Sequence, residues 1–326
     1  MSILITGGAG YIGSHLAKAM SEKGEDIVIY DNLSTGHAEV SQKLNLPLVE
    51  GDIRDKKLLL ETFRKYNVEG IIHFAASSLV AESCENPYKY YDNNLYGTMI
   101  LLDAMREAGV KYIVFSSTAA TYGEPASIPI VETNTTVPTN PYGNTKLSME
   151  QMMKWFDEAY GTKYVSLRYF NAAGADPEGL IGEEHDPETH LIPIVLQAAI
   201  GKRKFVSIFG EDYDTRDGSC VRDYIHVNDL AQAHILALEY LFKGGNSDIF
   251  NLGSGKGFTV KEIIETARKV TKKEIKAVSA PRRNGDPAVL IASSEKIKNK
   301  LGWIPQKDDV SMIIADAWNY MTRNSR

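Results

Sequence analysis

The chain has little cysteine and no concentration of positive charge. Its 326 residues include only two cysteines, Cys84 and Cys220, which lie far apart and show no metal-ligand spacing. This makes a disulfide framework improbable. Lysine and arginine number 36 against 42 acidic residues, so the formal net charge is −6. Because no basic run stands out, binding to nucleic acid or to a membrane surface is not expected.

Long apolar runs are also absent. No hydrophobic stretch reaches the roughly 20 residues that a transmembrane helix needs. A predicted strand that starts at residue 2 leaves no room for a signal peptide, so we expect a cytoplasmic enzyme. Hydrophobic residues make up 43% of the chain and charged residues 24%, as in an ordinary globular protein. The length allows about two domains.

A glycine-rich turn lies at the start of the chain. Residues 2–6 form a short apolar run typical of a buried parallel strand. The pattern G-x-G-x-x-G follows at Gly8, Gly10 and Gly13, and from Tyr11 onward apolar residues recur at helical spacing. A helix that follows such a turn presents free N–H groups and its positive dipole end to a pyrophosphate. The pattern therefore predicts a cradle for a dinucleotide.

The second predicted strand, residues 26–31, ends in an acid. Asp31 lies about 20 residues beyond the glycines, where a carboxylate binds the hydroxyls of the adenosine ribose. Because that carboxylate repels a 2′-phosphate, NAD is favoured over NADP as the cofactor. The alternative is a strand–turn–helix unit that binds no ligand and leaves Asp31 facing solvent.

Strand-like and helical segments alternate over the first half of the chain. Further strands are predicted at 47–50, 70–76, 112–117 and 164–170, with helices at 58–66, at 90–108 with a break at Gly97, and after residue 142. This alternation predicts an α/β fold with a Rossmann-type, doubly wound parallel sheet. Shorter elements follow residue 171. We therefore expect an NAD-binding domain at 1–172 and a smaller α/β substrate domain at 173–326, from which some segments return to the first.

Tyr142 and Lys146 are the candidate catalytic residues. Residues four apart on a helix share one face, so both side chains can point into the same cleft. A nearby ammonium and the positive ring of NAD⁺ would lower the pKa of the phenol, which could then accept the proton of a substrate hydroxyl while the carbon loses hydride. Ser116 and Thr118, at a predicted strand end, could hold the same oxygen. The alternative is a surface Tyr–Lys pair that arises by chance.

These motifs together resemble one enzyme family. The stretches that carry the resemblance are residues 6–15 (TGGAGYIGSH), 31–33 (DNL), 51–54 (GDIR), 115–117 (FSS), 141–146 (PYGNTK), 168–171 (RYFN), 221–227 (VRDYIHV) and 281–286 (PRRNGD). They resemble the extended short-chain dehydrogenases/reductases and, among these, the UDP-glucose 4-epimerase family. The resemblance implies a homodimer with NAD as cofactor. It also implies interconversion of UDP-glucose and UDP-galactose by oxidation at C4, rotation of the 4-keto sugar and re-reduction.

The resemblance also assigns roles to single residues. Tyr142 is the implied base, Lys146 lowers its pKa, and Thr118 shares the hydrogen bond to the 4-hydroxyl. The NAD-binding residues would be Gly7, Gly10, Tyr11, Ile12, Gly13, Asp31, Asn32, Leu33, Ser34, Thr35, Gly36, Asp52, Ile53, Phe74, Ala75, Ala76, Ser77, Ser78, Asn93, Thr118, Tyr142, Lys146 and Phe170. The UDP-sugar would be held by Thr118, Tyr142, Asn171, His190, Leu191, Ser207, Ile208, Phe209, Arg222, Arg283, Asn284, Gly285, Asp286 and Leu290.

Particular positions bear on the choice among relatives. Related dehydratases carry an Asp-Glu pair, and decarboxylases a glutamate, where this chain has Ala119 and Ala120. No acid is therefore available there for elimination. Leu290 stands where some relatives have a bulky tyrosine, so a broader UDP-hexose/UDP-N-acetylhexosamine 4-epimerase is the alternative. Ser78 stands where some relatives place a lysine near the cofactor phosphates. A net dehydrogenase and a catalytically idle nucleotide-binding regulator are more distant alternatives.

A metal site is not expected. The acid-rich stretch at residues 183–186 and His190 offer metal-ligand types. Such loops are more often solvated, however, and the implied chemistry needs no metal.

Overall fold

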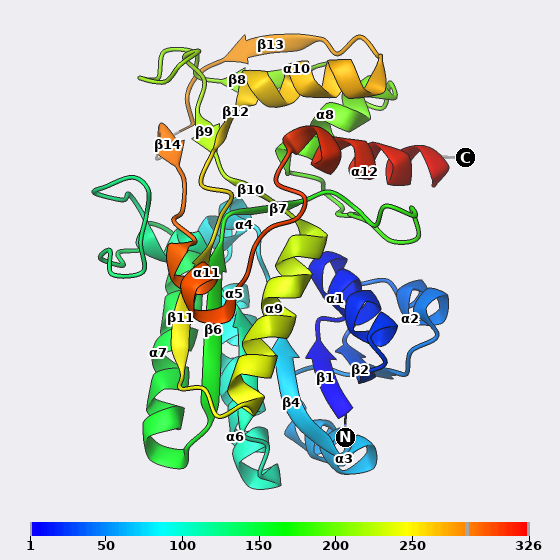
Figure 1. Ribbon diagram of the computed structural model, residues 1–326, viewed down its shortest axis with the longest axis vertical. Coiled ribbons are helices and arrows are strands. Elements are labelled where there is room, and N and C mark those ends of the chain that lie inside the picture. The colour runs from blue at the N-terminus through cyan, green and yellow to red at the C-terminus, as the bar shows by residue number, and fades with distance from the viewer. Residues whose placement is uncertain (1, 284–286, 325–326) are drawn as a thin grey trace.

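A seven-stranded sheet forms the centre of the larger part of the structure, of which the computed structural model describes residues 2–283 and 287–324 (Figure 1). The strand order is β11-β6-β5-β4-β1-β2-β3, and each neighbouring pair is parallel. The strands are β1 (Ser2–Thr6), β2 (Asp26–Asp31), β3 (Leu48–Glu50), β4 (Val68–His73), β5 (Tyr112–Ser116), β6 (Lys163–Tyr169) and β11 (Asp248–Leu252). This order confirms the predicted doubly wound α/β fold.

Helices cover both faces of this sheet, which explains why its strands are nearly continuous apolar runs. One face is covered by α1 (Tyr11–Glu22), α9 (Val227–Phe242) and α11 (Glu295–Leu301). The other is covered by α3 (Lys56–Tyr66), α6 (Gly97–Ala108) and α7 (Pro141–Tyr160). Strand β11 and helices α9 and α11 come from the second half of the chain. Segments beyond residue 172 therefore return to the large sheet.

The predicted break at Gly97 does not interrupt the helical path. α5 (Pro87–Tyr90) leads through a π-helical turn, η1 (Tyr91–Tyr96), into α6, and Gly97 keeps helical dihedral angles of φ −58° and ψ −43°. A Cβ at Gly97 would lie 2.6 Å from the Ile53 side chain. Gly97 thus allows α6 to approach the loop after β3, and it does not end the helix.

The smaller part has a core of its own. Its helices α8 (Leu191–Ala199), α10 (Val260–Thr271) and α12 (Val310–Arg323) pack against β8 (Val206–Phe209), which pairs in parallel with β13 (Ala277–Ala280). Two further short sheets pair β7 (Asn171–Ala173) with β10 (Tyr224–His226), and β9 (Val221–Arg222) with β12 (Phe258–Thr259) and β14 (Val289–Leu290). The remaining short helices are α2 (Glu39–Leu44), α4 (Val80–Glu85) and the 3₁₀ turn η2 (Ala119–Tyr122).

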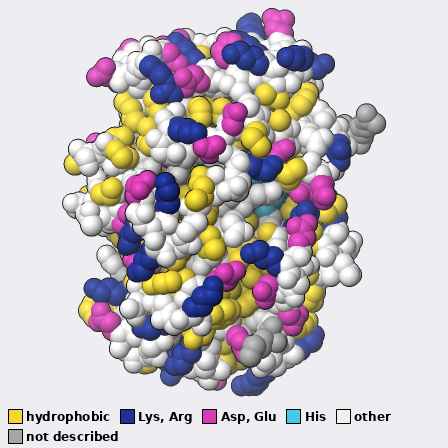
Figure 2. All heavy atoms as spheres, in the orientation of Figure 1, with side chains coloured by type: hydrophobic (Ala, Val, Ile, Leu, Met, Phe, Trp, Pro, Cys, Tyr) yellow, Lys and Arg dark blue, Asp and Glu magenta, His cyan; other side chains and the backbone are white. Residues whose placement is uncertain are grey.

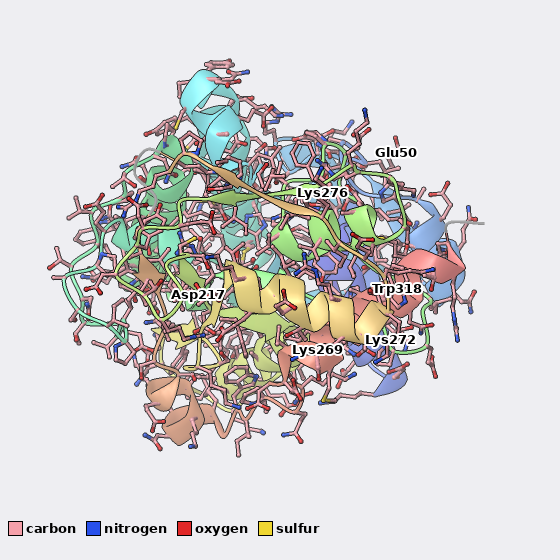
Figure 3. The ribbon with its side chains drawn as sticks, turned by 90° about the horizontal axis from the view of Figure 1, so that it is seen from above. Glu50, Asp217, Lys269, Lys272, Lys276 and Trp318 are labelled. Carbon is pink, nitrogen blue, oxygen red and sulfur yellow. The ribbon has the colours of Figure 1, made fainter. Side chains whose placement is uncertain are left out.

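Helix α10 shows how local sequence determines an element of the smaller part. Thr259 and Glu262 form a reciprocal capping box that satisfies N–H groups at its start. Seen from above, Asp217 lies by the N-terminal end of α10, and Lys269 and Lys272 lie toward its C-terminal end (Figure 3). Charges of these signs at these ends are favoured by the helix dipole.

The surface mixes charges of both signs. Acidic and basic side chains lie close together across the face shown in Figure 2. Over the part of the chain that the structure describes, no helix combines the length and the apolar character needed to cross a bilayer.

Candidate active site

The glycine-rich turn lies between β1 and α1 and is packed too closely for side chains. Gly7 has a φ of 74°, and its N–H donates to the carbonyl of Tyr30 at 2.8 Å. A Cβ at Gly13 would lie 2.2 Å from the Gly7 carbonyl oxygen, and one at Gly7 would lie 2.6 Å from the backbone nitrogen of Ala75. α1 begins at Tyr11 without a side-chain cap. Its first N–H groups are therefore left for an anion, as a pyrophosphate site requires.

Asp31 ends β2 beside this turn. Its carboxylate accepts hydrogen bonds from the N–H groups of Ala9 at 3.0 Å and Leu33 at 2.9 Å. Burial raises the pKa of Asp31, while these two hydrogen bonds act in the opposite direction. A Cβ at Gly36 would lie 3.0 Å from a carboxylate oxygen of Asp31. The segment 32–36 therefore folds closely around the acid, and the predicted ribose site and phosphate site are neighbours.

The other predicted cofactor residues follow the ends of β3 and β4. Asn32 donates to the Asp52 carboxylate at 3.0 Å. β4 ends at His73, earlier than the predicted 70–76, so Phe74–Ser78 form the loop after it. The Asn93 amide on η1 donates to Ser77 Oγ within this loop at 3.4 Å. The structure thus brings the predicted cofactor residues to the carboxyl ends of adjacent strands, where ligands of such sheets bind.

A cavity of about 320 Å³ lies beside the cradle. Gly10, Tyr11 and Thr35 line it from the large sheet, and residues from the segment 181–185 line it from the smaller part. The cradle therefore has open space next to it.

Asn94, which the sequence analysis did not select, ties the loop after β4 to α7. Its side chain is fully buried. It accepts from the Ser77 N–H at 2.8 Å, donates to the Ser77 carbonyl at 3.0 Å and donates to Thr145 Oγ1 at 3.2 Å. No local pattern distinguishes it from its neighbour Asn93, which was predicted.

Tyr142 and Lys146 lie on one face of α7, as their spacing predicted. The helix starts with Pro141, and the Asn140 side chain caps it by accepting from the Gly143 N–H at 2.8 Å. The side chain of Thr118 lies close enough to the Tyr142 hydroxyl to lower the pKa of the phenol. Lys146 Nζ lies 5.9 Å from the centre of the Tyr142 ring.

Lys146 is held at the end of β5. Its Nζ donates to the carbonyl of Ser116 at 2.9 Å. The hydroxyl of Ser116 itself is hydrogen-bonded to the hydroxyl of Tyr169. Ser116 therefore contacts the Tyr–Lys pair through its backbone, whereas Thr118 presents its side chain to Tyr142.

Burial controls the protonation of the pair. It raises the pKa of Tyr142 to about 12, and the nearby Thr118 side chain only partly offsets this. Burial also lowers the pKa of Lys146 to about 7, against the effect of the Glu150 charge. The phenol pKa is thus raised in the chain alone, whereas the lowering predicted from the sequence also involves the positive ring of bound NAD⁺. Desolvation is the largest influence on the pKa of Tyr142.

A buried ion pair supports this face of α7 and was not predicted. Glu150 and Arg168 are 3% and 4% exposed, and the guanidinium donates to both carboxylate oxygens, one bond measuring 2.9 Å. Ser117 also donates to Glu150. Two sequence signals could have shown the pair: Glu150 stands four residues after Lys146, and Arg168 interrupts an apolar strand.

Several predicted substrate residues meet where the two parts of the structure join. Asn171 donates to the Asp223 carbonyl at 2.9 Å. Arg222 is the register partner of Leu290 in the β9–β14 pair. Leu290 packs with Phe170 against a small apolar cluster that includes Ala119. Phe170 and Leu290 therefore lie beside Ala119 of η2, which directly follows Thr118.

Other predicted substrate residues are arranged differently. Arg283 stacks on the Phe209 ring with its guanidinium carbon 4.0 Å from the ring centre. Ile208 packs into the core of the smaller part, and Leu191 packs against the same core. Ser207 lies beside Ile208 on β8, where it pairs with Val278. Asn284, Gly285 and Asp286 lie outside the described residues.

His190 precedes α8 but turns its ring toward two carboxylates. Its Nδ1 lies 2.8 Å from Glu183 and 3.1 Å from Glu188. Burial lowers the pKa of His190, but the hydrogen bonds with these two glutamates outweigh it and raise the pKa to about 10. This ring nitrogen is therefore engaged within the protein.

Comparisons with known proteins agree with this fold. A profile of the family described as GDP-mannose 4,6 dehydratase matches residues 4–314. The UDP-glucose 4-epimerase of Halalkalibacterium halodurans is 58% identical over 320 residues, which cover 98% of this chain and 95% of that protein. A crystal structure of a UDP-glucose 4-epimerase has a TM-score of 0.98 at 52% identity, covering 100% of this chain and 99% of that one.

A third relative was solved with ligands. The UDP-glucose 4-epimerase of Bifidobacterium longum, in complex with NAD⁺ and UDP, has a TM-score of 0.93 at 38% identity and covers 100% of this chain and 99% of that one. The likeness includes both the large sheet and the smaller part. On the match to these relatives along nearly its whole length, the chain belongs to the UDP-glucose 4-epimerase family of the extended short-chain dehydrogenases/reductases.

Proposed function

We propose that this enzyme interconverts UDP-glucose and UDP-galactose by oxidising C4 of the hexose and reducing it again from the other face. The observation that carries the proposal is the placement of Tyr142 beside Thr118 and buried Lys146, at the same sheet edge as the glycine cradle. The name and the whole-length match of the relatives support the same substrate pair.

The cradle fits NAD. When bound, NAD would supply the group that accepts the hydride from C4 of the hexose and later returns it. The close-packed turn at Gly7 and Gly13 and the free start of α1 would hold the pyrophosphate, and Asp31 would bind the adenosine ribose. A relative of this family was solved with NAD⁺.

Tyr142 would act as the proton acceptor and donor. It takes the proton of the 4-hydroxyl during oxidation and returns a proton during reduction, while Thr118 holds the same oxygen. A phenol whose burial raises its pKa to about 12 needs nearby positive charge to ionise at neutral pH. The ammonium form of Lys146 provides such a charge on the same helix face.

The position after Thr118 favours an epimerase over a dehydratase. Ala119 and Ala120 begin η2, so this turn offers no carboxylate to remove a proton or protonate a leaving hydroxyl. The oxidised sugar therefore has no acid from η2 beside it for elimination. Re-reduction is the outcome that these side chains favour.

Epimerisation also requires the keto sugar to turn while the nucleotide stays bound. Arg222 and Arg283 would hold the diphosphate, because guanidinium groups bind phosphate oxygens bidentately. Leu290 packs with Phe170 beside Ala119, and these residues would face the hexose together with Asn171. Firm binding of the nucleotide and weak contacts to the hexose would permit rotation.

The direct test is to incubate purified protein with UDP-galactose without added reductant and to quantify both C4 epimers. We expect an equilibrium mixture with UDP-glucose and no build-up of NADH. Accumulation of NADH with an oxidised sugar would instead show a net dehydrogenase. Binding without conversion would show a nucleotide-binding regulator. A separate incubation with UDP-N-acetylgalactosamine tests whether the pocket admits an N-acetylated sugar. We expect UDP-galactose to be preferred.

We further propose that the enzyme is a homodimer. Tyr96, Met99 and Trp155 are 45%, 42% and 63% exposed on the neighbouring elements η1, α6 and α7. Exposed large apolar side chains on neighbouring elements are what a subunit interface would cover. By light scattering, the Trp155→Glu variant should have the mass of a monomer. Phe205→Glu, which changes an exposed aromatic residue directly before β8, should remain a dimer. A monomeric native protein would contradict this proposal.

We also propose that the enzyme works in the cytoplasm. Cys84 lies at the surface and Cys220 in the interior, and no disulfide joins them, which suits a compartment where thiols stay reduced. Cell fractionation followed by detection of the protein tests this, and recovery outside the cytoplasmic fraction would contradict it.

A further inference from the structure

Two glutamates and two histidines converge in the segment between β7 and α8. One ligand-type atom from each of these four side chains lies within 4.8 Å of all the others, and we refer to them as the Glu–His cluster: Glu183, His185, Glu188 and His190. The Nδ1 atoms of both histidines approach the same carboxylate oxygen of Glu183, at 2.9 Å from His185 and 2.8 Å from His190.

The carboxylates of this cluster are deeply buried. The side chains of Glu183 and Glu188 are 6% and 4% exposed. Among the described residues, these two carboxylates form ion pairs only with His185 and His190. Two buried negative charges are costly unless positive charge lies between them. Burial thus distinguishes this cluster from the solvated acidic loop expected from the sequence.

The spacing of the cluster suits a metal ion. Two ligand atoms on a tetrahedral zinc, each about 2.1 Å from it, lie about 3.4 Å apart. The histidine–carboxylate separations in the cluster, from 2.8 Å to 4.0 Å, bracket that value. The two imidazole rings lie 5.1 Å apart at 45°, so both can present a nitrogen to one point. Glu183, His185 and Glu188 also line a cavity of about 180 Å³.

We propose that the Glu–His cluster binds one divalent transition metal ion, for which Zn²⁺ is the best match. A set of two imidazole nitrogens and two carboxylates suits Zn²⁺ better than Mg²⁺ or Ca²⁺, which prefer oxygen ligands. One divalent ion also neutralises both buried carboxylates. Four protein ligands leave no open position on a tetrahedral ion, so the site is structural and takes no part in the chemistry at C4.

The place of the cluster indicates what the ion stabilises. The His185 ring lies edge-to-face on Tyr11 at 6.1 Å, and the Tyr11 hydroxyl donates to the Gly174 carbonyl at 2.7 Å. Tyr11 is the first residue of α1, in the dinucleotide cradle. The ion would therefore fasten the segment 174–190 of the smaller part against the cradle.

The first experiment measures metal binding by the native protein. The chain is purified without a polyhistidine tag, stripped with a chelator and titrated with Zn²⁺ alone in the calorimeter. We expect saturable binding of one Zn²⁺ per chain, no comparable binding of Mg²⁺, and an X-ray absorption spectrum with nitrogen and oxygen neighbours at about 2.0–2.2 Å. Failure to bind Zn²⁺ saturably would overturn the proposal.

Variants then locate the ion. Glu183→Gln preserves the size of the side chain and removes one ligand charge, so Zn²⁺ affinity should fall by more than about 100-fold, beyond the loss seen for outer-shell changes. Glu184→Gln, at the next residue and outside the cluster, is the matched control and should bind Zn²⁺ like the native chain. Equal affinity of Glu183→Gln and the native protein would overturn the assignment. Circular dichroism of each variant confirms that it is folded.

Discussion

Replacing Glu150 by glutamine tests the buried charges beneath the proposed catalytic face. Glutamine has the same shape, but it leaves the guanidinium of Arg168, which is 4% exposed, without its counter-charge. Removing one partner of a buried ion pair costs about 3–5 kcal/mol, because the other charge remains desolvated. For a chain of this length the midpoint of thermal unfolding should fall by roughly 4–7 °C, measured by calorimetry.

Two controls distinguish the effect of losing a buried charge from the effect of losing any charge. Glu158→Gln removes an exposed acid on the same helix, where Lys154 Nζ is 3.9 Å away, and should change the unfolding free energy by less than about 0.5 kcal/mol. The double variant E150M/R168M removes both buried charges and should recover most of the stability lost in E150Q. An E150Q protein with the same midpoint of thermal unfolding as the native protein would refute the reasoning.

The same variant should change the dependence of activity on pH. Burial lowers the pKa of Lys146 to about 7, and the Glu150 charge acts to raise it. Without that charge the pKa of Lys146 falls further, and the ammonium form, present below the pKa, is lost at lower pH. The decline of kcat/KM with rising pH should therefore begin at lower pH in E150Q than in the native enzyme. Superimposable profiles would show that Lys146 does not act as a cation.

Three further changes test the cofactor and substrate sites. Gly13→Ala places a Cβ 2.2 Å from the Gly7 carbonyl oxygen, so NAD affinity in calorimetry should fall at least about tenfold, and unchanged affinity would contradict the cradle. Asp31→Asn removes a charged acceptor, so NAD affinity should fall at least about tenfold and the preference for NAD over NADP should narrow. An unchanged ratio of NAD affinity to NADP affinity would exclude binding of the ribose by Asp31. Leu290→Tyr adds bulk beside Phe170, so turnover of UDP-N-acetylgalactosamine relative to UDP-galactose should fall, and a rise would place Leu290 outside the pocket.

Alternating local patterns were enough to predict the sheet up to β6, because each strand and helix there is a continuous segment of clear periodicity. Strand β11 was not predicted. It has five residues, and it joins the sheet only by pairing with β6, from which it is separated by the whole of the segment 170–247. Gly97 was misread for a related reason, since its role depends on the distant Ile53. Both cases depend on contacts between segments far apart in the chain.

The candidate site likewise contains features that the local sequence predicts and features that it does not. The glycine turn and the Tyr142–Lys146 face each lie within one short segment, so spacing alone could indicate them. Asn94 and the Glu150–Arg168 pair depend on burial against other elements. Desolvation also has the largest influence on the pKa of Tyr142 in the chain alone, and residue spacing does not show it.

The central claim is that the hydroxyl of Tyr142 carries the proton of the C4 hydroxyl, and Tyr142→Phe tests it most directly. UDP-galactose binding is measured by calorimetry and conversion by chromatography. Tyr90→Phe, whose ring centre lies 6.5 Å from that of Tyr142, is the matched control and should turn over substrate like the native enzyme. We predict that Tyr142→Phe lowers kcat by about 10²–10⁴-fold with substrate affinity retained. Turnover at the native rate by Tyr142→Phe would contradict the account.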